Sequence, residues 1–303
     1  MLITCGINSI EGLKIVAQSG VDEVFCGVQD RAIRSPFLRI LNRREMPGAN
    51  LGGVNALKEL TRVAKGLGVR VSVTLNEMFT AAQYGEVRRL LDALCTIPVD
   101  GLIISDFALL LLLYHEYGGR FVIHMGTGAL SLNTNVISLY KKYGARRVVL
   151  SRKIFTHEIA GIIKKSNGIE TEVFMEVNAF CPNFDGLCNY LHNNSLSSLT
   201  RCSSIENQFK IEPSGRPLGV INEGCKLCAI WDYARLGVTC MKVPARAGEP
   251  LATARLVRLI RGIEGLAVSL SKQEFVNRVK TEFYNVYSRP CAIESGCFLA
   301  REL

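Results

Sequence analysis

The chain has 303 residues, of which 48% are hydrophobic and 21% are charged, and its mean hydropathy is +0.20. A chain of this length and composition can bury a large apolar core, which excludes a disordered or low-complexity protein. Lys and Arg outnumber Asp and Glu by 36 to 27, and the resulting pI near 9.0 favours acidic partners such as nucleic acid, anionic small molecules or a membrane surface. A modestly basic enzyme without such a partner has the same charge balance.

No part of the sequence predicts a membrane span or export. The longest apolar run, residues 107–114, is far shorter than the about 20 residues needed to cross a bilayer. Residues 1–5 contain no basic segment or cleavage site of the kind found in secretory signals. We therefore expect a cytoplasmic protein, in which 11 cysteines indicate metal or redox chemistry rather than disulfides.

In chain order, short apolar runs predict eight β-strands, and most are followed by a helical pattern. The strands are expected at residues 2–5, 23–26, 70–75, 101–104, 120–124, 147–150, 172–175 and 239–243. Helices are expected at residues 11–18, 55–66, 86–95, 134–143, 155–165 and 228–237, several of them followed by glycine. Runs that are apolar throughout are typical of parallel strands buried on both faces.

This alternation predicts an α/β protein with a single domain over residues 1–303, a TIM-like (β/α)8 barrel. A doubly wound open sheet is the alternative, but no G-x-G-x-x-G motif follows any of the strands. The pattern is interrupted between the seventh and eighth strands by a Cys-rich insertion, residues 178–228. Such an insertion follows the carboxyl end of a strand, where barrels carry their chemistry. Residues 250–303 are expected to form closing helices and a tail.

Five cysteines lie within the insertion: Cys181, Cys188, Cys202, Cys225 and Cys228. About four thiolates hold an iron–sulfur cluster, so this set predicts a cluster-binding site. Zinc is the main alternative to a cluster, because four cysteines also form structural zinc sites. However, only the last two cysteines have the C-x2-C spacing of a zinc knuckle, and we therefore favour the cluster. Buried thiols without a metal are the third possibility.

The remaining cysteines are expected to have simpler roles. Cys26, Cys95 and Cys240 lie within predicted strands or helices, and we assign them to the core. Cys5 ends the first strand and could face the mouth of the barrel. Cys291 and Cys297 flank the tail and could be additional ligands.

Two side chains at strand ends are candidate catalytic groups. His124 ends the fifth strand and could act as a general acid or base, since an ordinary histidine has a pKa near neutrality; a structural histidine is the alternative. Arg152 follows the sixth strand, and its guanidinium suits a carboxylate or a phosphate. An ion pair with Glu158 on the next helix is the alternative for Arg152.

Lys242 and Arg246 close the predicted barrel and could bind an anionic substrate. The alternative for both is an ion pair with Glu172 or Glu176. The pocket is also expected to contain substrate-binding side chains next to the ends of the third and seventh strands. These are Asn76, Glu77, Glu176 and Asn178.

Four arginines crowd the loop after the second strand: Arg31, Arg34, Arg43 and Arg44. They could contact RNA phosphates, although arginines in a long loop are often simply solvated. Few aromatic residues accompany them, which weakens the case for a base-stacking surface.

Several of these segments resemble peptidase family U-32, the collagenase-like peptidases. The similar segments are residues 20–27, 73–77, 99–106, 147–152 with Glu158, and 237–246, in the order and spacing of the family. The resemblance covers nearly the whole chain and implies a barrel with a 4Fe–4S cluster. By that resemblance, Cys181, Cys188 and Cys202 are the first three ligands, and the fourth is Cys228 or Cys225.

The resemblance also implies a function. Related proteins perform oxygen-independent hydroxylation of ubiquinone precursors or of RNA pyrimidines, the latter associated with prephenate as the oxygen source, and some of them pair with a related chain. We therefore expect an iron–sulfur hydroxylase that acts on an RNA base or an aromatic or quinone precursor. A peptidase, as the family name implies, is the first alternative. A non-catalytic electron-transfer or partner subunit is the second.

Overall fold

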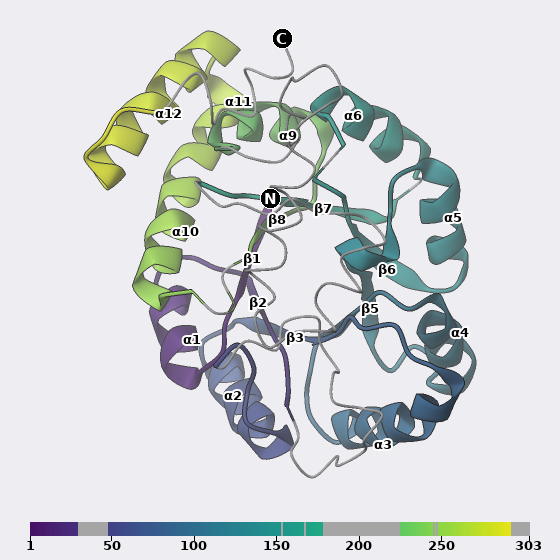
Figure 1. Cartoon of the computed structure of the whole chain (residues 1–303). Helices are drawn as coiled ribbons and strands as arrows, with labels where there is room; N and C mark the ends of the chain where they lie inside the picture. Colours follow the sequence, from purple (N-terminus) through teal and green to yellow (C-terminus); the bar gives the residue numbers. More distant parts are fainter. Residues whose placement is uncertain are drawn as a thin grey trace, which may run out of the picture.

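The computed structural model of the chain describes residues 1–29, 48–152, 154–166, 168–177, 225–244, 246 and 248–291. Within these ranges, eight parallel strands form a closed barrel in sequence order, and helices surround it (Figure 1). The strands are β1 (Leu2–Gly6), β2 (Glu23–Cys26), β3 (Arg70–Leu75), β4 (Gly101–Ile104), β5 (Val122–Met125), β6 (Ala145–Val149), β7 (Glu170–Phe174) and β8 (Cys240–Val243). The barrel closes where Leu2 pairs with Cys240. The predicted (β/α)8 fold is confirmed.

The helices of the described residues follow the strands around the barrel. They are α1 (Ile10–Ala17), α2 (Val54–Gly66), α3 (Tyr84–Cys95), α4 (Phe107–Glu116), α5 (Thr134–Lys142), α6 (Thr156–Lys165), α9 (Ile230–Leu236), α10 (Pro250–Glu264), α11 (Leu266–Ser269) and α12 (Lys272–Tyr287). Local polar residues determine where several begin: the side chain of Asn133 accepts hydrogen bonds from two backbone amides of α5. At the other end, Gly237 adopts φ +82° after α9, a left-handed conformation that favours glycine.

Helix α4 was not among the predicted helices. Its sequence is almost uniformly apolar, and four of its leucines are buried. A helix that is apolar on nearly every side lacks the 3.6-residue periodicity by which an amphipathic helix is found. Its start has a local signal nonetheless, because the side chain of Asp106 accepts a hydrogen bond from the amide of Ala108.

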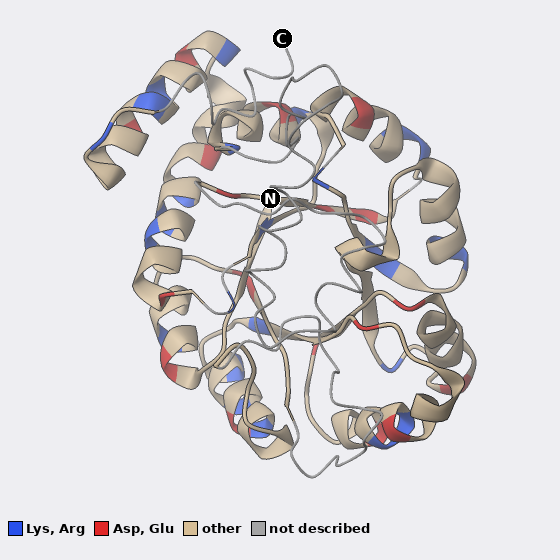
Figure 2. Cartoon of the chain, viewed as in Figure 1, with Lys and Arg blue, Asp and Glu red and all other residues tan. Residues whose placement is uncertain are grey.

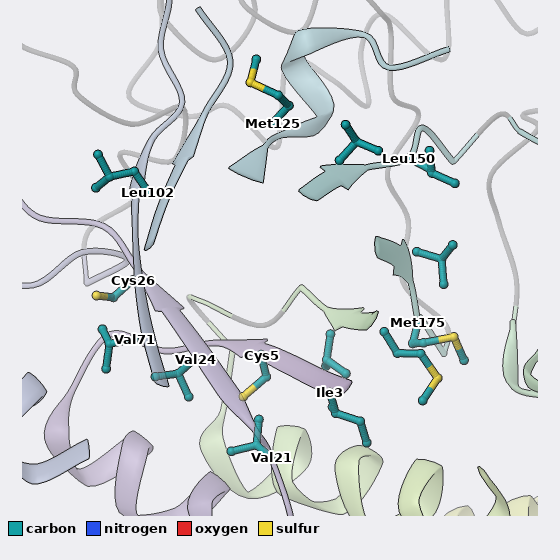
Figure 3. Packing of buried hydrophobic residues seen from close by; sticks show 14 of the residues in the cluster. Ile3, Cys5, Val21, Val24, Cys26, Val71, Leu102, Met125, Leu150 and Met175 are labelled. Carbon is teal, nitrogen blue, oxygen red and sulfur yellow. The ribbon is translucent and has the colours of Figure 1, made fainter. Parts of the chain in front are cut away.

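The hydrophobic core lies between the barrel and its helices. Outward-facing strand residues such as Ile3, Val24 and Leu102 pack there in one cluster (Figure 3). Cys5 and Cys26 belong to the same cluster, and neither side chain is exposed. The expectation that Cys5 could face the barrel mouth is wrong, because alternation along β1 turns it toward the helices. Burial raises the pKa of the Cys5 thiol to about 12, which keeps it protonated.

The inward faces of the strands are not apolar. Charged residues occur on the strands as well as on the outer helices (Figure 2). Glu23, Arg147, Glu172 and Lys242 are all buried. The expectation of strands that are apolar on both faces therefore holds for the outer face and fails for the inner one. In the part of the chain that the structure describes, no helix combines the length and apolarity needed to cross a membrane.

Candidate functional site

The carboxyl ends of the strands gather polar side chains at one end of the barrel, here called the mouth. Asn76 and Glu77 follow β3, Arg152 follows β6, Glu176 follows β7 and Arg246 follows β8. All of these except Asn76, which is half-buried, are buried. Because the carboxyl ends of parallel strands meet at the same end of a barrel, the mouth is where this fold can bind a substrate.

Arg152 and Glu176 form a bidentate ion pair at the mouth. The Nε of Arg152 lies 2.8 Å from Oε2 of Glu176, and its Nη2 bonds the other carboxylate oxygen. The guanidinium also lies 3.5 Å from the ring centroid of Phe174. Glu158, considered as the partner of Arg152, instead accepts a hydrogen bond from the amide of Phe155 at the start of α6. The pair thus joins the ends of two neighbouring strands and keeps the guanidinium in one orientation.

Lys242 lies inside the barrel beside Glu172. Its Nζ is 2.6 Å from Oε1 of Glu172 and 4.0 Å from the ring centroid of Phe25. Burial by itself would raise the pKa of the Glu172 carboxyl, but Lys242 and Arg147 hold that pKa below its ordinary value. The ion pair weighed for Lys242 as the alternative to substrate binding is therefore present, and it holds this side chain at the floor of the mouth.

Arg246 reaches the opposite side of the mouth. Its Nη1 donates a hydrogen bond of 2.6 Å to the hydroxyl of Thr74 on β3. The backbone around Arg246 comes very close to Gly6 at the end of β1: a Cβ on Gly6 would lie 2.6 Å from the Arg246 nitrogen. Gly6 is thus required for the position of Arg246, a role that we did not derive from the sequence.

His124 does not occupy the position expected for it. The side chain is buried inside the barrel, with Nδ1 3.7 Å from Oε1 of Glu23, and is not at the open end. Burial lowers the pKa of the imidazole to about 4, although Glu23 opposes the shift. The expected pKa near neutrality is therefore wrong for the folded protein, and His124 is neutral at physiological pH.

Beneath the mouth, Arg147 is the centre of a charged network that sequence reasoning missed. Its Nη1 lies 3.2 Å from carboxylate oxygens of both Glu23 and Glu172, and its Nε lies 2.9 Å from Glu170. Cys240, assigned to the apolar core, is in this network instead, with its sulfur 3.7 Å from Nη1 of Arg147. The sequence does contain a signal for this network, because Arg147 is a charged residue at an inward position of an apolar strand.

Two carboxylates organise the loops on the β3 and β4 side of the mouth. Glu77 accepts a hydrogen bond from the amide of Met78. Asp106, which was not predicted as a site residue, accepts one from the hydroxyl of Tyr84 at 2.8 Å and one from the amide of Phe79 at 3.1 Å. Asp106 thereby connects the loop after β3 to the start of α4.

Part of the predicted cysteine set comes next to the mouth. The amide of Lys226 donates a hydrogen bond of 3.2 Å to the carbonyl oxygen of Glu176, which places residues 225–228 beside the Arg152–Glu176 pair. Cys228 is buried and Cys225 is half-buried. Two thiols three residues apart in the sequence at this place fit the chemistry of a cluster or a zinc ion.

The other predicted ligands and contacts lie outside the described residues. These are Cys181, Cys188, Cys202, Cys297, Asn178, Arg31, Arg34, Arg43 and Arg44. Among the residues that are described, no three His, Cys, Asp or Glu side chains are grouped so that they could hold a metal ion. A set of four ligands would therefore need at least two residues from the remainder of the chain.

Comparison with known proteins identifies the family. A sequence model described as peptidase family U32 matches residues 8–302. The chain belongs to peptidase family U32. A solved structure described as a U32 peptidase has the same fold, with a TM-score of 0.55 at 17% identity, over 82% of this chain and 94% of that one. The family resemblance of the sequence is thus confirmed.

Curated relatives of this U32 chain include proteins named for tRNA hydroxylation. It is 24% identical to tRNA hydroxylation protein P of Haemophilus influenzae over 68% of this chain and 42% of that protein. It is 27% identical to tRNA hydroxylation protein P1 of Bacillus subtilis over 60% of this chain and 39% of that protein. The chain thus spans about two fifths of the length of these relatives.

Proposed function

We propose that this U32 chain is an iron–sulfur enzyme that takes part in oxygen-independent hydroxylation of a base in tRNA. The names of its relatives support the reaction and the RNA substrate. The observation that carries the proposal is the hydrogen bond from Lys226 to Glu176, because it brings Cys225 and Cys228 next to the buried cations of the mouth. A redox group and an anion-binding pocket would then share one site.

The proposed ligands are Cys181, Cys188, Cys202 and one of Cys225 and Cys228. A 4Fe–4S cluster bound by these thiolates would supply one-electron chemistry at a potential set by burial and hydrogen bonding. Cys225 is the more accessible of the last two thiols, and Cys228 is packed into the core. The fourth ligand is therefore a question for single substitutions.

The chain's own residues would bind and orient the reactants. Arg152, Arg246 and Lys242 would meet negatively charged groups, either RNA phosphates or the carboxylates of an organic oxygen donor such as prephenate. Glu176 would hold Arg152 in place, while Asn76 and Glu77 would contact polar groups of the substrate from the opposite side. His124 lies 3.7 Å from Glu23 and would bring no positive charge to this arrangement at neutral pH.

The described histidines do not support a peptidase. His115 contacts Tyr114, His124 contacts Glu23, and His157 stacks on Phe155. None of these contacts activates a serine or cysteine nucleophile, which a protease of the Ser–His or Cys–His type requires. We therefore place hydroxylation before proteolysis.

Anaerobic purification with a visible spectrum and counts of iron and sulfide tests the cluster. We expect the wild-type protein to be coloured. One of the two variants Cys225→Ala and Cys228→Ala should lose most of the visible absorbance, and the other variant should keep it. Cys95→Ala is the matched control, because this half-buried thiol lies on α3. A colourless protein that contains zinc would contradict the proposal.

The reaction is tested separately in bacteria that lack their own tRNA hydroxylation protein. Mass spectrometry of tRNA nucleosides is expected to show one added oxygen atom when this chain is supplied, and strongly reduced product with Arg152→Met. Cluster-containing protein that leaves tRNA unmodified would instead favour the electron-transfer role.

A further inference from the structure

A cavity lies at the end of the barrel opposite the mouth. Its volume is about 510 Å3, and it is formed by the last turn of α4, the segment leading into β5, and the residues between α5 and β6. Helices of this fold run antiparallel to the strands, so the carboxyl ends of α4 and α5 lie at the amino ends of β5 and β6. The cavity is thus separate from the proposed catalytic site, and its volume is in the range of small-molecule sites.

Aromatic rings form the walls of this cavity. The rings of Tyr114 and Tyr143 meet edge to face, with their centroids 5.7 Å apart and their planes at 88°. The rings of Tyr117 and Phe121 lie 6.3 Å apart on the other side. Tyr143 also packs edge to face on Phe107 of α4, which holds its ring in place. Such preformed ring surfaces favour a planar aromatic ligand.

Positive charge lies at the rim. The guanidinium of Arg120 lies 5.5 Å from the ring centroid of Phe121, and the ammonium of Lys142 lies 5.6 Å from that of Tyr143. Arg120 uses Nη2 to donate a hydrogen bond to the carbonyl oxygen of Cys95, and the rest of its exposed guanidinium faces solvent within the described structure. A ligand whose ring enters the cavity would thus place an attached anionic group near these cations.

Two glycines of the lining strengthen the case for an anion. Gly118 and Gly119 follow α4 with φ of +51° and +79°. A right-handed residue followed by a left-handed one turns successive amides toward the same side, which is a recurring way to bind an anion. Here Tyr117, with φ −111° and ψ 0°, precedes Gly118.

The ends of helices α4 and α5 disfavour an anion in the cavity, so their partial charge must be compensated. The carboxyl ends of α4 and α5 carry partial negative charge, which disfavours an anion near their last carbonyls. Lys141 and Lys142 in the last turn of α5 compensate for this charge. The only carboxylate bonded to a lining side chain in the described structure, Asp92, accepts a hydrogen bond from the hydroxyl of Tyr117. An anionic group is therefore expected at the Arg120 rim, away from the helix carbonyls.

We propose that this cavity binds a nucleotide, with its base against the tyrosine rings and its phosphate at Arg120 and the amides of Gly118 and Gly119. The nucleotide could be free or part of an RNA strand, since both present the same base and phosphate. The site does not depend on the proposed function, because none of its residues belongs to the mouth.

Calorimetric titration of the purified full chain with AMP, adenosine and inorganic phosphate tests the site. AMP is expected to bind more tightly than adenosine or phosphate. Arg120→Ala should weaken AMP binding about tenfold or more while leaving adenosine binding unchanged. Tyr114→Ala, which removes a half-exposed ring, should weaken both AMP and adenosine. Tyr284→Ala is the control, because this exposed tyrosine lies on α12.

A short single-stranded RNA distinguishes the two sources of the nucleotide. If the RNA displaces AMP and its binding also falls in Arg120→Ala, the site holds a nucleotide of an RNA strand; if it does not displace AMP, the ligand is a free nucleotide. No AMP binding, or AMP binding that neither Arg120→Ala nor Tyr114→Ala changes, would overturn the proposal. The cluster spectrum of Arg120→Ala should equal that of the wild type, which separates this test from that of the proposed function.

Discussion

At the scale of single residues, buried charge defines the barrel interior. An unpaired charge inside a protein is costly, and buried charges persist where partners surround them. Arg147 meets Glu23 and Glu172, and Lys242 also meets Glu172, so each of these charges has an opposite charge beside it. The network holds Lys242 beneath the mouth, where it would face an anionic substrate.

His124 provides a prediction about pH. Its pKa is about 4 in the folded protein and near 6.5 in the unfolded chain. Between these values the unfolded chain binds more protons, so stability falls as the pH falls. When the pH is lowered from about 7.5 to about 5, the free energy of unfolding of the wild type should fall by about 2 kcal/mol more than that of His124→Gln.

Urea unfolding at the two pH values measures this difference. His115→Gln is the control, since it replaces an exposed histidine on α4 and leaves the barrel interior unchanged. An equal loss of stability in wild type and His124→Gln would show that His124 is not the titrating group.

At the scale of elements, the close approach of β1 and the segment after β8 determines the position of Arg246. A Cβ on Gly6 would lie 2.6 Å from the backbone nitrogen and 2.8 Å from the Cα of Arg246, so backbone would have to move. We therefore expect Gly6→Ala to lower the free energy of unfolding by about 1–3 kcal/mol, as overpacking does elsewhere. The displaced Arg246 should also lose its hydrogen bond to Thr74.

Gly262 offers a matched control within α10. A Cβ there meets nothing within 4 Å, and the position is exposed. Because alanine favours a helix interior over glycine, Gly262→Ala should raise stability by about 0.5–1 kcal/mol. Denaturant unfolding of both variants gives the comparison, and a Gly6→Ala protein as stable as the wild type would refute the argument.

At the scale of the whole molecule, α10 contacts the first strand-containing part of the chain at the point where the barrel closes. Arg261 donates hydrogen bonds to the backbone carbonyls of Gly20 and Met1 and forms ion pairs with Asp22 and Glu264. Gly20, Asp22 and Met1 lie 239 to 260 residues from Arg261 in the sequence, so these contacts stabilise the barrel where it closes.

Arg261→Ala should accordingly lower the free energy of unfolding by about 2 kcal/mol, because it removes two ion pairs and two hydrogen bonds to backbone carbonyls. Arg258→Ala removes an exposed arginine from the same helix and should change stability by less than about 0.5 kcal/mol. Thermal and urea unfolding check both values. Similar losses in the two variants would mean that the closure contacts contribute little.

Local patterns were enough to predict most elements of the barrel. The strands at 23–26, 70–75 and 101–104 have their predicted bounds, because apolar runs bordered by polar residues are local signals. Helix α4 was not predicted from the sequence, because a uniformly apolar segment has no helical periodicity. Strand-end positions likewise indicated Arg152, Glu176 and Arg246 as mouth residues, since parallel strands all end on one face.

By itself, the sequence determined the order of strands and helices, the family and the residue types available at the mouth. Only the tertiary structure decided which of these side chains meet. Glu23 and Arg147 are separated by 124 residues and face each other inside the barrel. Arg152 pairs with Glu176, at the end of the next strand, and not with the nearer Glu158. Such pairings depend on barrel closure and strand stagger, which bring together side chains from different strands and which no local pattern encodes.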